Sequence, residues 1–267
     1  MRSKTRKILA FTICFVLIFC SLPMTAFGAA KTVKQTINLN STKDLKGAGY
    51  NWDASKHTLT LENADLKASG KPIFKLDKKA NVKIVLKGEN KLSCPDAAVI
   101  SSGGSKNGGR LTFTGTGSLE VEGYMYINSK EVTVANCKLQ VSPAKGVPGI
   151  YRSFTNTGSG DFIVTGGAKV TLKDGLNAGA KNDKLIVNGA ELNVSSAYFG
   201  STVDVSSDVI VKNGGKLKVS NLYKPAEEEE SEGITRFSNG IFTAGNVIFD
   251  ESSIVDISSL DVYKRQV

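Results

Sequence analysis

The sequence predicts an all-β protein: a right-handed parallel β-helix of roughly eight coils with three short strands per coil. Pairs of short alternating apolar stretches recur along the chain, and alternation with a period of two indicates a β-strand. In LIVNGAELNV, residues 185–194, two such stretches flank Asn188-Gly189, a strong turn dipeptide. Taken alone, this segment is either a hairpin or two sides of one coil with the turn at the corner.

The recurrence of the pattern favours the coil. The pair of stretches occurs eight times, and successive copies begin 21 to 38 residues apart. An internal repeat of this length indicates a solenoid. An antiparallel meander would also alternate, but it would not leave the same kind of third segment after the pairs. The first stretches begin at Leu59, Ile84, Leu111, Val132, Phe162, Leu185, Val209 and Val247, and the third segments are AAVISS, YMYINS, GIYRSF, GLNAGA, AYFGS and NGIFTAG.

Both ends of the chain are predicted to lie outside the fold. Residues 1–30 combine a basic start, an apolar core at Ile8–Leu22 and small residues near position 30, which is the pattern of a secretory signal peptide. A retained anchor is the alternative, although the core is short for a membrane span of about 20 residues. Residues 261–267 contain DVYKRQ, which resembles the translated end of a sequencing-library adapter; a natural tail is the alternative. We therefore expect one β-helix domain at 31–260, with the true C-terminus missing.

The charge and hydropathy of the sequence argue against a nucleic-acid partner and against a membrane span in the expected domain. The formal net charge is +9, but 28 basic and 24 acidic residues remain in 31–260, which leaves +4. Such a mildly basic chain, without Lys and Arg runs among aromatics, does not predict nucleic-acid binding. No later stretch is apolar enough to span a membrane, so we expect an exported protein. Residues 224–233, KPAEEEESEG, predict a disordered loop insertion, with a cation- or partner-binding loop as the alternative.

The expected domain keeps two cysteines, Cys94 and Cys137. Cys94 occupies an inward position, and Cys137 lies in a corner two coils later. Two coils separate the Cα atoms by about 10 Å, which is too far for a disulfide. We therefore predict free, mostly buried thiols, and a fold that depends on its hydrogen-bond ladder and its core.

The sequence shows no catalytic motif. His57 is the only histidine and has no partner motif, so we expect it at the surface. Nucleophile-elbow, HExxH and phosphate-binding-loop patterns do not occur in the sequence. Some polysaccharide lyases and hydrolases share the parallel β-helix, but fold alone is not evidence of activity. The aspartates that such an enzyme would cluster fall mostly at predicted corners and coil edges, namely Asp161, Asp174, Asp183, Asp204, Asp208 and Asp250.

Outward-facing tyrosines give the candidate binding site. In the third segments, Met125 and Ile127 should point inwards, which turns the tyrosines beside them outwards. The same alternation places Ile150, Ala197 and Phe199 inside. Equivalent positions of successive coils stack on one face, so the tyrosines are expected to form a stripe that suits sugar rings. The alternative is that they only cover the solenoid. The predicted ligand-binding residues are Tyr124, Tyr126, Tyr151, Arg152, Asn177 and Tyr198, with Asn128 as a further polar neighbour.

The N-terminal part carries a family resemblance. Trp52, the only tryptophan, lies in GYNWDASKHTLTLENADL, residues 49–66, and is expected to cap the first coil, with ligand contact as the alternative. Together with NVKIVLKGEN and RLTFTGTGSLEVEG, this segment resembles secreted parallel β-helix proteins of Gram-positive anaerobes described as carbohydrate-binding-domain-containing proteins. The similarity extends over nearly the whole mature chain as a repeat pattern. It implies an extracellular, non-catalytic module that faces polysaccharide, and it raises calcium as an assisting ion, although no calcium ligands match residue by residue.

These observations predict a secreted or cell-surface β-helix that binds polysaccharide without cleaving it. Attachment to the cell surface would run through the missing C-terminal region. A scaffold or adhesin that contacts a protein partner is the second hypothesis, and a polysaccharide lyase or hydrolase is the third. The residues themselves point to no cofactor, and calcium enters only through the resemblance.

Overall fold

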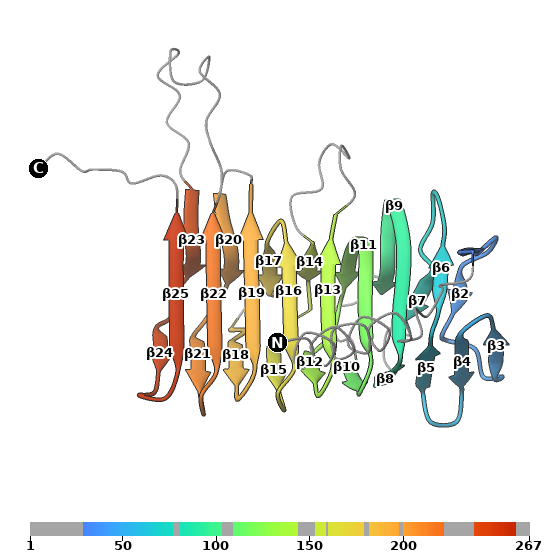
Figure 1. Ribbon diagram of the computed structural model, residues 1–267, viewed down its shortest axis with the longest axis horizontal. Helices are drawn as coiled ribbons and strands as arrows, with labels where there is room; N and C mark the ends of the chain where they lie inside the picture. Colours follow the sequence, from blue (N-terminus) through green and yellow to red (C-terminus); the bar gives the residue numbers. More distant parts are fainter. Residues whose placement is uncertain are drawn as a thin grey trace, which may run out of the picture.

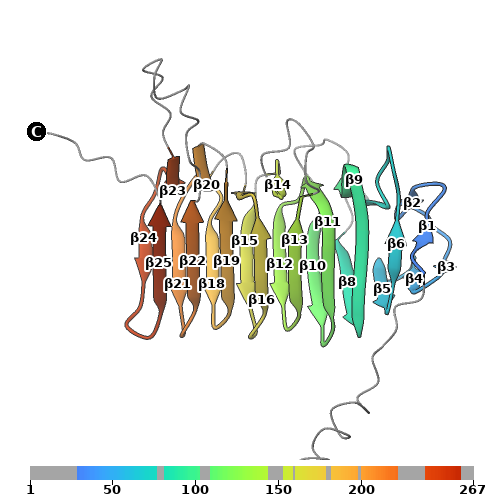
Figure 2. The same cartoon turned by 45° about the horizontal axis from the view of Figure 1, so that its top comes forward.

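The computed structural model confirms the predicted class: the described residues form a parallel β-solenoid, and none of them is helical. The structure describes residues 29–76, 81–102, 109–143, 153–158, 160–178, 182–197, 200–221 and 238–259. In this part of the chain no helix is long and apolar enough to cross a membrane. The strands lie side by side along a rod, with the first coil at one end and the last at the other (Figures 1 and 2). The predicted signal peptide lies outside the described residues except for its last two positions, and the acidic loop at 224–233 and the suspected scar lie outside them entirely.

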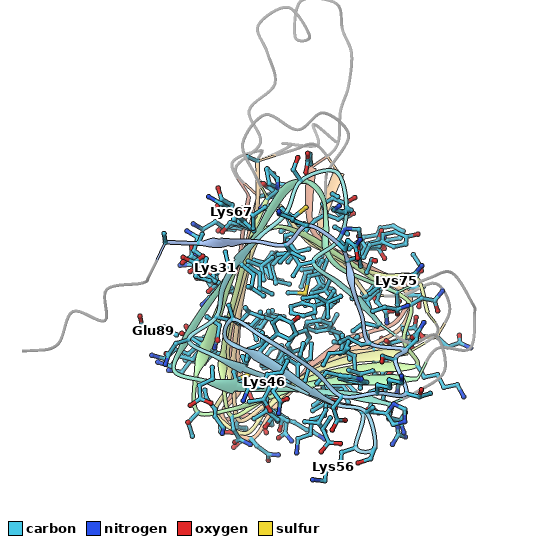
Figure 3. All side chains as sticks on the ribbon, turned by 90° about the vertical axis from the view of Figure 1, so that its right-hand side faces the viewer. Lys31, Lys46, Lys56, Lys67, Lys75 and Glu89 are labelled. Carbon is cyan, nitrogen blue, oxygen red and sulfur yellow. The ribbon has the colours of Figure 1, made fainter. Side chains whose placement is uncertain are left out.

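The rod has three faces around a triangular core that is filled with side chains (Figure 3). Face 1 is a ten-stranded sheet, and faces 2 and 3 form one fifteen-stranded sheet because β9 and β11 pair with strands of both. Face 1 consists of β3 (Leu45–Gly47), β4 (Tyr50–Asp53), β5 (Thr58–Glu62), β8 (Val82–Lys87), β10 (Arg110–Gly115), β12 (Glu131–Ala135), β15 (Asp161–Thr165), β18 (Leu185–Asn188), β21 (Val209–Lys212) and β24 (Val247–Phe249).

The strands of the other two faces follow in the same order along the chain. Face 2 consists of β1 (Lys31–Thr32), β6 (Asp65–Lys67), the first halves of β9 (Glu89–Ser102) and β11 (Ser118–Ile127), β13 (Lys138–Ser142), β16 (Lys169–Lys173), β19 (Glu191–Ser196), β22 (Lys216–Asn221) and β25 (Ile254–Ser259). Face 3 consists of β2 (Ile37–Asn38), β7 (Phe74–Leu76), the second halves of β9 and β11, β14 (Phe154–Asn156), β17 (Leu176–Ala178), β20 (Gly200–Val205) and β23 (Ser238–Thr243).

From β5 onwards the described strands make seven coils with a segment on each of the three faces, and an eighth coil that consists of β24 and β25. β1 and β2 precede them and pair with β6 and β7 of the first coil. LIVNGAELNV is two sides of one coil: β18 pairs with β15 and β21 on face 1, and β19 pairs with β16 and β22 on face 2. Gly189 turns the corner between them with a φ of 57°. A residue without a Cβ adopts this left-handed conformation at low cost, which explains the Asn-Gly dipeptide here.

The core consists of apolar columns that run along the rod. Leu185 and Val187 of β18 lie in register with Phe162 and Val164 of β15, and all four side chains are fully buried. Burial of each such side chain contributes about 1.5–3 kcal/mol. Cys94 and Cys137 belong to the same core as free thiols, as predicted, and burial raises the pKa of Cys137 to about 11.

Two third-face strands differ from the sequence-based prediction. The sequence predicted third strands at GIYRSF and AYFGS. The observed strands begin later in the chain, at β14 in place of GIYRSF and at β20 in place of AYFGS. Phe154 anchors β14 by packing edge-on against Phe162, with ring centroids 5.0 Å apart. The prediction that Ala197 points inwards is wrong, because Ala197 is exposed and the inward positions of this coil are Val203 and Val205.

The two ends of the rod are closed to different degrees. At the N-terminal end, β3 and β4 add antiparallel strands to face 1, and Trp52 of β4 is fully buried. Its indole N–H donates to the Ser41 carbonyl oxygen at 3.2 Å, so Trp52 belongs to the cap as predicted. At the other end, Phe249 and Ile257 occupy core-facing positions opposite Val211 and Val219 but are 59% and 48% exposed.

Polar side chains inside the corners bind the backbone of neighbouring coils. Asn156 is fully buried; its side-chain oxygen accepts from the N–H of Ser129 at 3.0 Å and of Gly158 at 3.2 Å. Its amide nitrogen donates to the carbonyl oxygens of Ser129 at 3.1 Å and Gly160 at 3.4 Å. One side chain therefore satisfies backbone groups of two coils that would otherwise be buried without partners.

Removal of the Asn156 amide tests this account of the corners. Asn156→Ala is expected to lower the free energy of unfolding by about 2–4 kcal/mol, because buried backbone groups lose their partners. Thr155→Ala, which changes the outward-facing neighbour, is the control and should change it by less than about 1 kcal/mol. Urea unfolding of both variants measures the difference, and equal effects would contradict the assigned role.

Asp174 makes the stability depend on pH. It follows β16 with a φ of 72°, and burial raises the pKa of its carboxyl group. Because the folded pKa is raised, the folded state disfavours the charged form, and stability falls as the pH rises through the unfolded value near 3.9. Asp174→Asn, which tolerates positive φ, should therefore raise the thermal midpoint at pH 7 and change it little at pH 3. A lower midpoint at pH 7 would refute this.

Candidate functional site

The three outer faces carry different kinds of side chain. On face 1, Ile163, Ile186, Ile210 and Ile248 lie in register on four successive coils, and Thr133 continues the column. Stacked β-branched residues of this kind stabilise neighbouring strands by about 0.2–1 kcal/mol per pair. On face 2, outward residues are mostly charged or polar, as in the ion pairs Lys91–Glu120 at 3.7 Å and Lys218–Asp256 at 3.6 Å.

Face 3 presents a single outward column. Several of its strands are only three residues long, so the middle residue alone points outwards between two inward neighbours. In-register pairing joins these positions into one line along the rod. From the N-terminal end, the column is Asn38, Lys75, Ser101, Tyr126, Thr155, Asn177, Asp204 and Phe242.

Two exposed aromatic rings bound the central part of this column. Tyr126 is 43% exposed and Phe242 is 56% exposed. Four coil spacings separate them, which corresponds to about 19 Å. Between them lie a hydroxyl, an amide and a carboxylate, from Thr155, Asn177 and Asp204. The arrangement is a line of short polar groups between two aromatic platforms.

The structure places three of the six predicted ligand-binding residues. Met125 and Ile127 are fully buried as expected, and Tyr124 and Tyr126 alternate with them on the outside of β11. Tyr126 and Asn177 share the face 3 column, and Tyr124 lies beside it, opposite Ala98. Asn128, the expected polar neighbour, is buried instead. Tyr151, Arg152 and Tyr198 lie outside the described residues.

The predicted stacking of tyrosines is wrong for Tyr126. Its ladder partners are Ser101 and Thr155, because the strand of the next coil is β14 rather than the segment around Tyr151. Phe242 belongs to the column and was missed by sequence reasoning. The alternation in NGIFTAG, with Ile241 in a core-facing position opposite Val203, is the signal that would have placed Phe242 outwards.

Three of the described aspartates act within the corners: Asp161, Asp208 and Asp250. The Lys184 N–H donates to Asp161 at 2.9 Å, and the Lys184 ammonium lies 3.2 Å from Asp208. Hydrogen bonds from Ser253, from the Asn213 N–H and from Ser252 lower the pKa of Asp250 to about 2. Each of these three carboxylates therefore holds a hydrogen bond or an ion pair with a corner or a neighbouring coil.

Metal-ligand chemistry is sparse on the described surface. Across the parts of the chain that the structure describes, no three His, Cys, Asp or Glu side chains gather as a metal site. Calcium, which the family resemblance raised, also binds backbone and amide oxygens, so it stays a prediction. His57 is exposed, as predicted, and its ring lies edge-on to Trp52 with centroids 6.0 Å apart, which gives it a place in the cap.

The fold and its surface define a class of protein: a β-solenoid in which each outward-facing residue stacks on the equivalent residue of the next coil. No protein-family model, curated protein or solved structure matches the chain significantly. The class therefore follows from the ladder, the core columns and the face 3 column themselves.

Proposed function

We propose that this protein is a secreted or cell-surface module that binds polysaccharide without cleaving it, and that face 3 is its binding surface. The observation that carries this proposal is the column from Tyr126 to Phe242, in which two exposed rings flank three short polar side chains. The C–H faces of sugar rings pack on aromatic rings, while hydroxyl, amide and carboxylate groups bond to sugar hydroxyls.

The repeat supports a polymer rather than a small ligand. Equivalent positions recur about every 4.8 Å along the rod, so a chain of sugars that lies along face 3 meets a new side chain at each coil. Secretion is part of the proposal, and the signal-like composition of residues 1–30 supports it.

A scaffold or adhesin that contacts a protein partner is the alternative function. The exposed apolar residues of the last coil favour it, because exposed apolar side chains at a sheet edge favour association with another polypeptide. This alternative predicts retention on cells or proteins and none on purified glycans. A lyase or hydrolase is the third possibility, and release of new reducing or unsaturated ends would identify it.

Substitution of the two aromatic platforms tests the proposal. In depletion assays against plant, mucin and cell-wall polysaccharides, Tyr126→Ala and Phe242→Ala should each weaken binding about three- to tenfold, because each removes one ring–sugar contact. Ile248→Ala, at 48% exposure on face 1, is the matched control and should bind normally. If the glycan that binds best is retained equally by all three variants, face 3 is not the site.

A further inference from the structure

A second surface lies at the corner where face 1 turns into face 2. Figure 3 shows this corner where Glu89 is labelled, on the side away from Lys75 of face 3. The outward column at the start of each face 2 strand runs along it. In coil order the column is Glu89, Ser118, Lys138, Lys169, Glu191 and Lys216.

The corner is hollowed because its turns lack side chains. Gly167, Gly189 and Gly214 turn the corner in three successive coils, and an added Cβ would meet nothing closer than 3.4 Å at any of them. They line a hollow of about 230 Å³ together with Lys169 and Lys216. A second hollow, of about 270 Å³, adjoins Lys169 and extends past Lys138. The two hollows share Lys169, and together they are called the groove below.

Three lysines of this groove form no ion pair within the described chain. Lys138 and Lys169 lie directly opposite each other in the ladder, where like charges destabilise a sheet. In the described chain neither they nor Lys216 form an ion pair, in contrast to Lys91 and Lys218 on the same face. Glu191 is the one acid between Lys169 and Lys216, and its carboxylate accepts from the Asn193 amide at 2.9 Å.

We propose that this groove binds an anionic polysaccharide, whose acidic groups contact Lys138, Lys169 and Lys216. The three lysines span three coil spacings, about 14 Å, which suits a polymer with repeated carboxylates better than a single anion. Gln140 and Thr171 line the same hollow and offer hydrogen bonds to sugar hydroxyls. Glu120 also lines it, and its carboxylate is paired with Lys91 at 3.7 Å. The residues that line the groove include no aromatic ring of the kind on which bases of single-stranded nucleic acids stack, so charge and hydrogen bonds would carry the binding here.

The inference rests on the proposed function, since it names the class of polysaccharide, but it uses a different surface. Polygalacturonate and its fully methyl-esterified form are the probes, because they share a backbone and differ in charge. The triple variant Lys138→Gln/Lys169→Gln/Lys216→Gln should weaken polygalacturonate binding about tenfold or more, at about two- to threefold per lysine. Binding to the ester should be unchanged, and added salt should weaken only the charged interaction.

Matched variants separate a specific groove from general attraction. Lys46→Gln/Lys83→Gln/Lys212→Gln removes the same charge from exposed lysines outside the groove and should change binding less than twofold. Lys138→Glu should raise the unfolding midpoint by removing the like-charge pair, and yet weaken binding. Equal losses in the two triple variants, or single-stranded DNA binding with the same lysine dependence, would overturn the inference. If neutral glycans still bind through Tyr126 and Phe242, the proposed function survives that failure; if no glycan binds, both fail.

Discussion

The in-register parallel ladder between coils is the constraint on which the rest of the structure depends. It stacks each inward position on its equivalent, so that Phe162, Leu185 and Val209 form one continuous column. A ladder of this kind must also turn three corners per coil without leaving backbone groups unpaired inside. Buried side chains such as Asn90 and Asn156 meet this need by binding the backbone of adjacent coils, in a chain whose described cysteines are free. These side chains therefore hold adjacent coils together at the corners.

The same constraint shapes the outer surface. A position that faces outwards in one coil faces outwards in the next, so any property of that position becomes a line along the rod. On face 1 this line consists of isoleucine side chains, which stabilise the sheet by packing on one another. On face 3 the strands leave room for one outward residue per coil, and Tyr126 and Phe242 stand above shorter polar groups. At the first corner the line brings Lys138 against Lys169, an arrangement that costs stability and offers charge to a ligand.

Much of the fold could be predicted from the sequence because its signals are local. The alternation in LIVNGAELNV, the turn at Asn188-Gly189 and the repeat interval each lie within a few dozen residues. The third strands were harder, since β14 has an inward asparagine at Asn156 where the pattern demands an apolar residue. The surface lines were harder still. Lys138 and Lys169 are 31 positions apart in the sequence, and the length of the connection between equivalent strands varies from coil to coil. Their pairing therefore becomes visible only in the strand register of the structure.

The central claim is that face 3 is the surface on which a polymer lies. Carbene footprinting of the wild-type protein, with and without the glycan that it retains best, tests this most directly because it reports which exposed side chains the polymer covers. The account predicts slower labelling of Tyr126 and Phe242 in the presence of polymer, and unchanged labelling of Ile248 on face 1. Unchanged labelling of both rings, under conditions in which the glycan is bound, would contradict it.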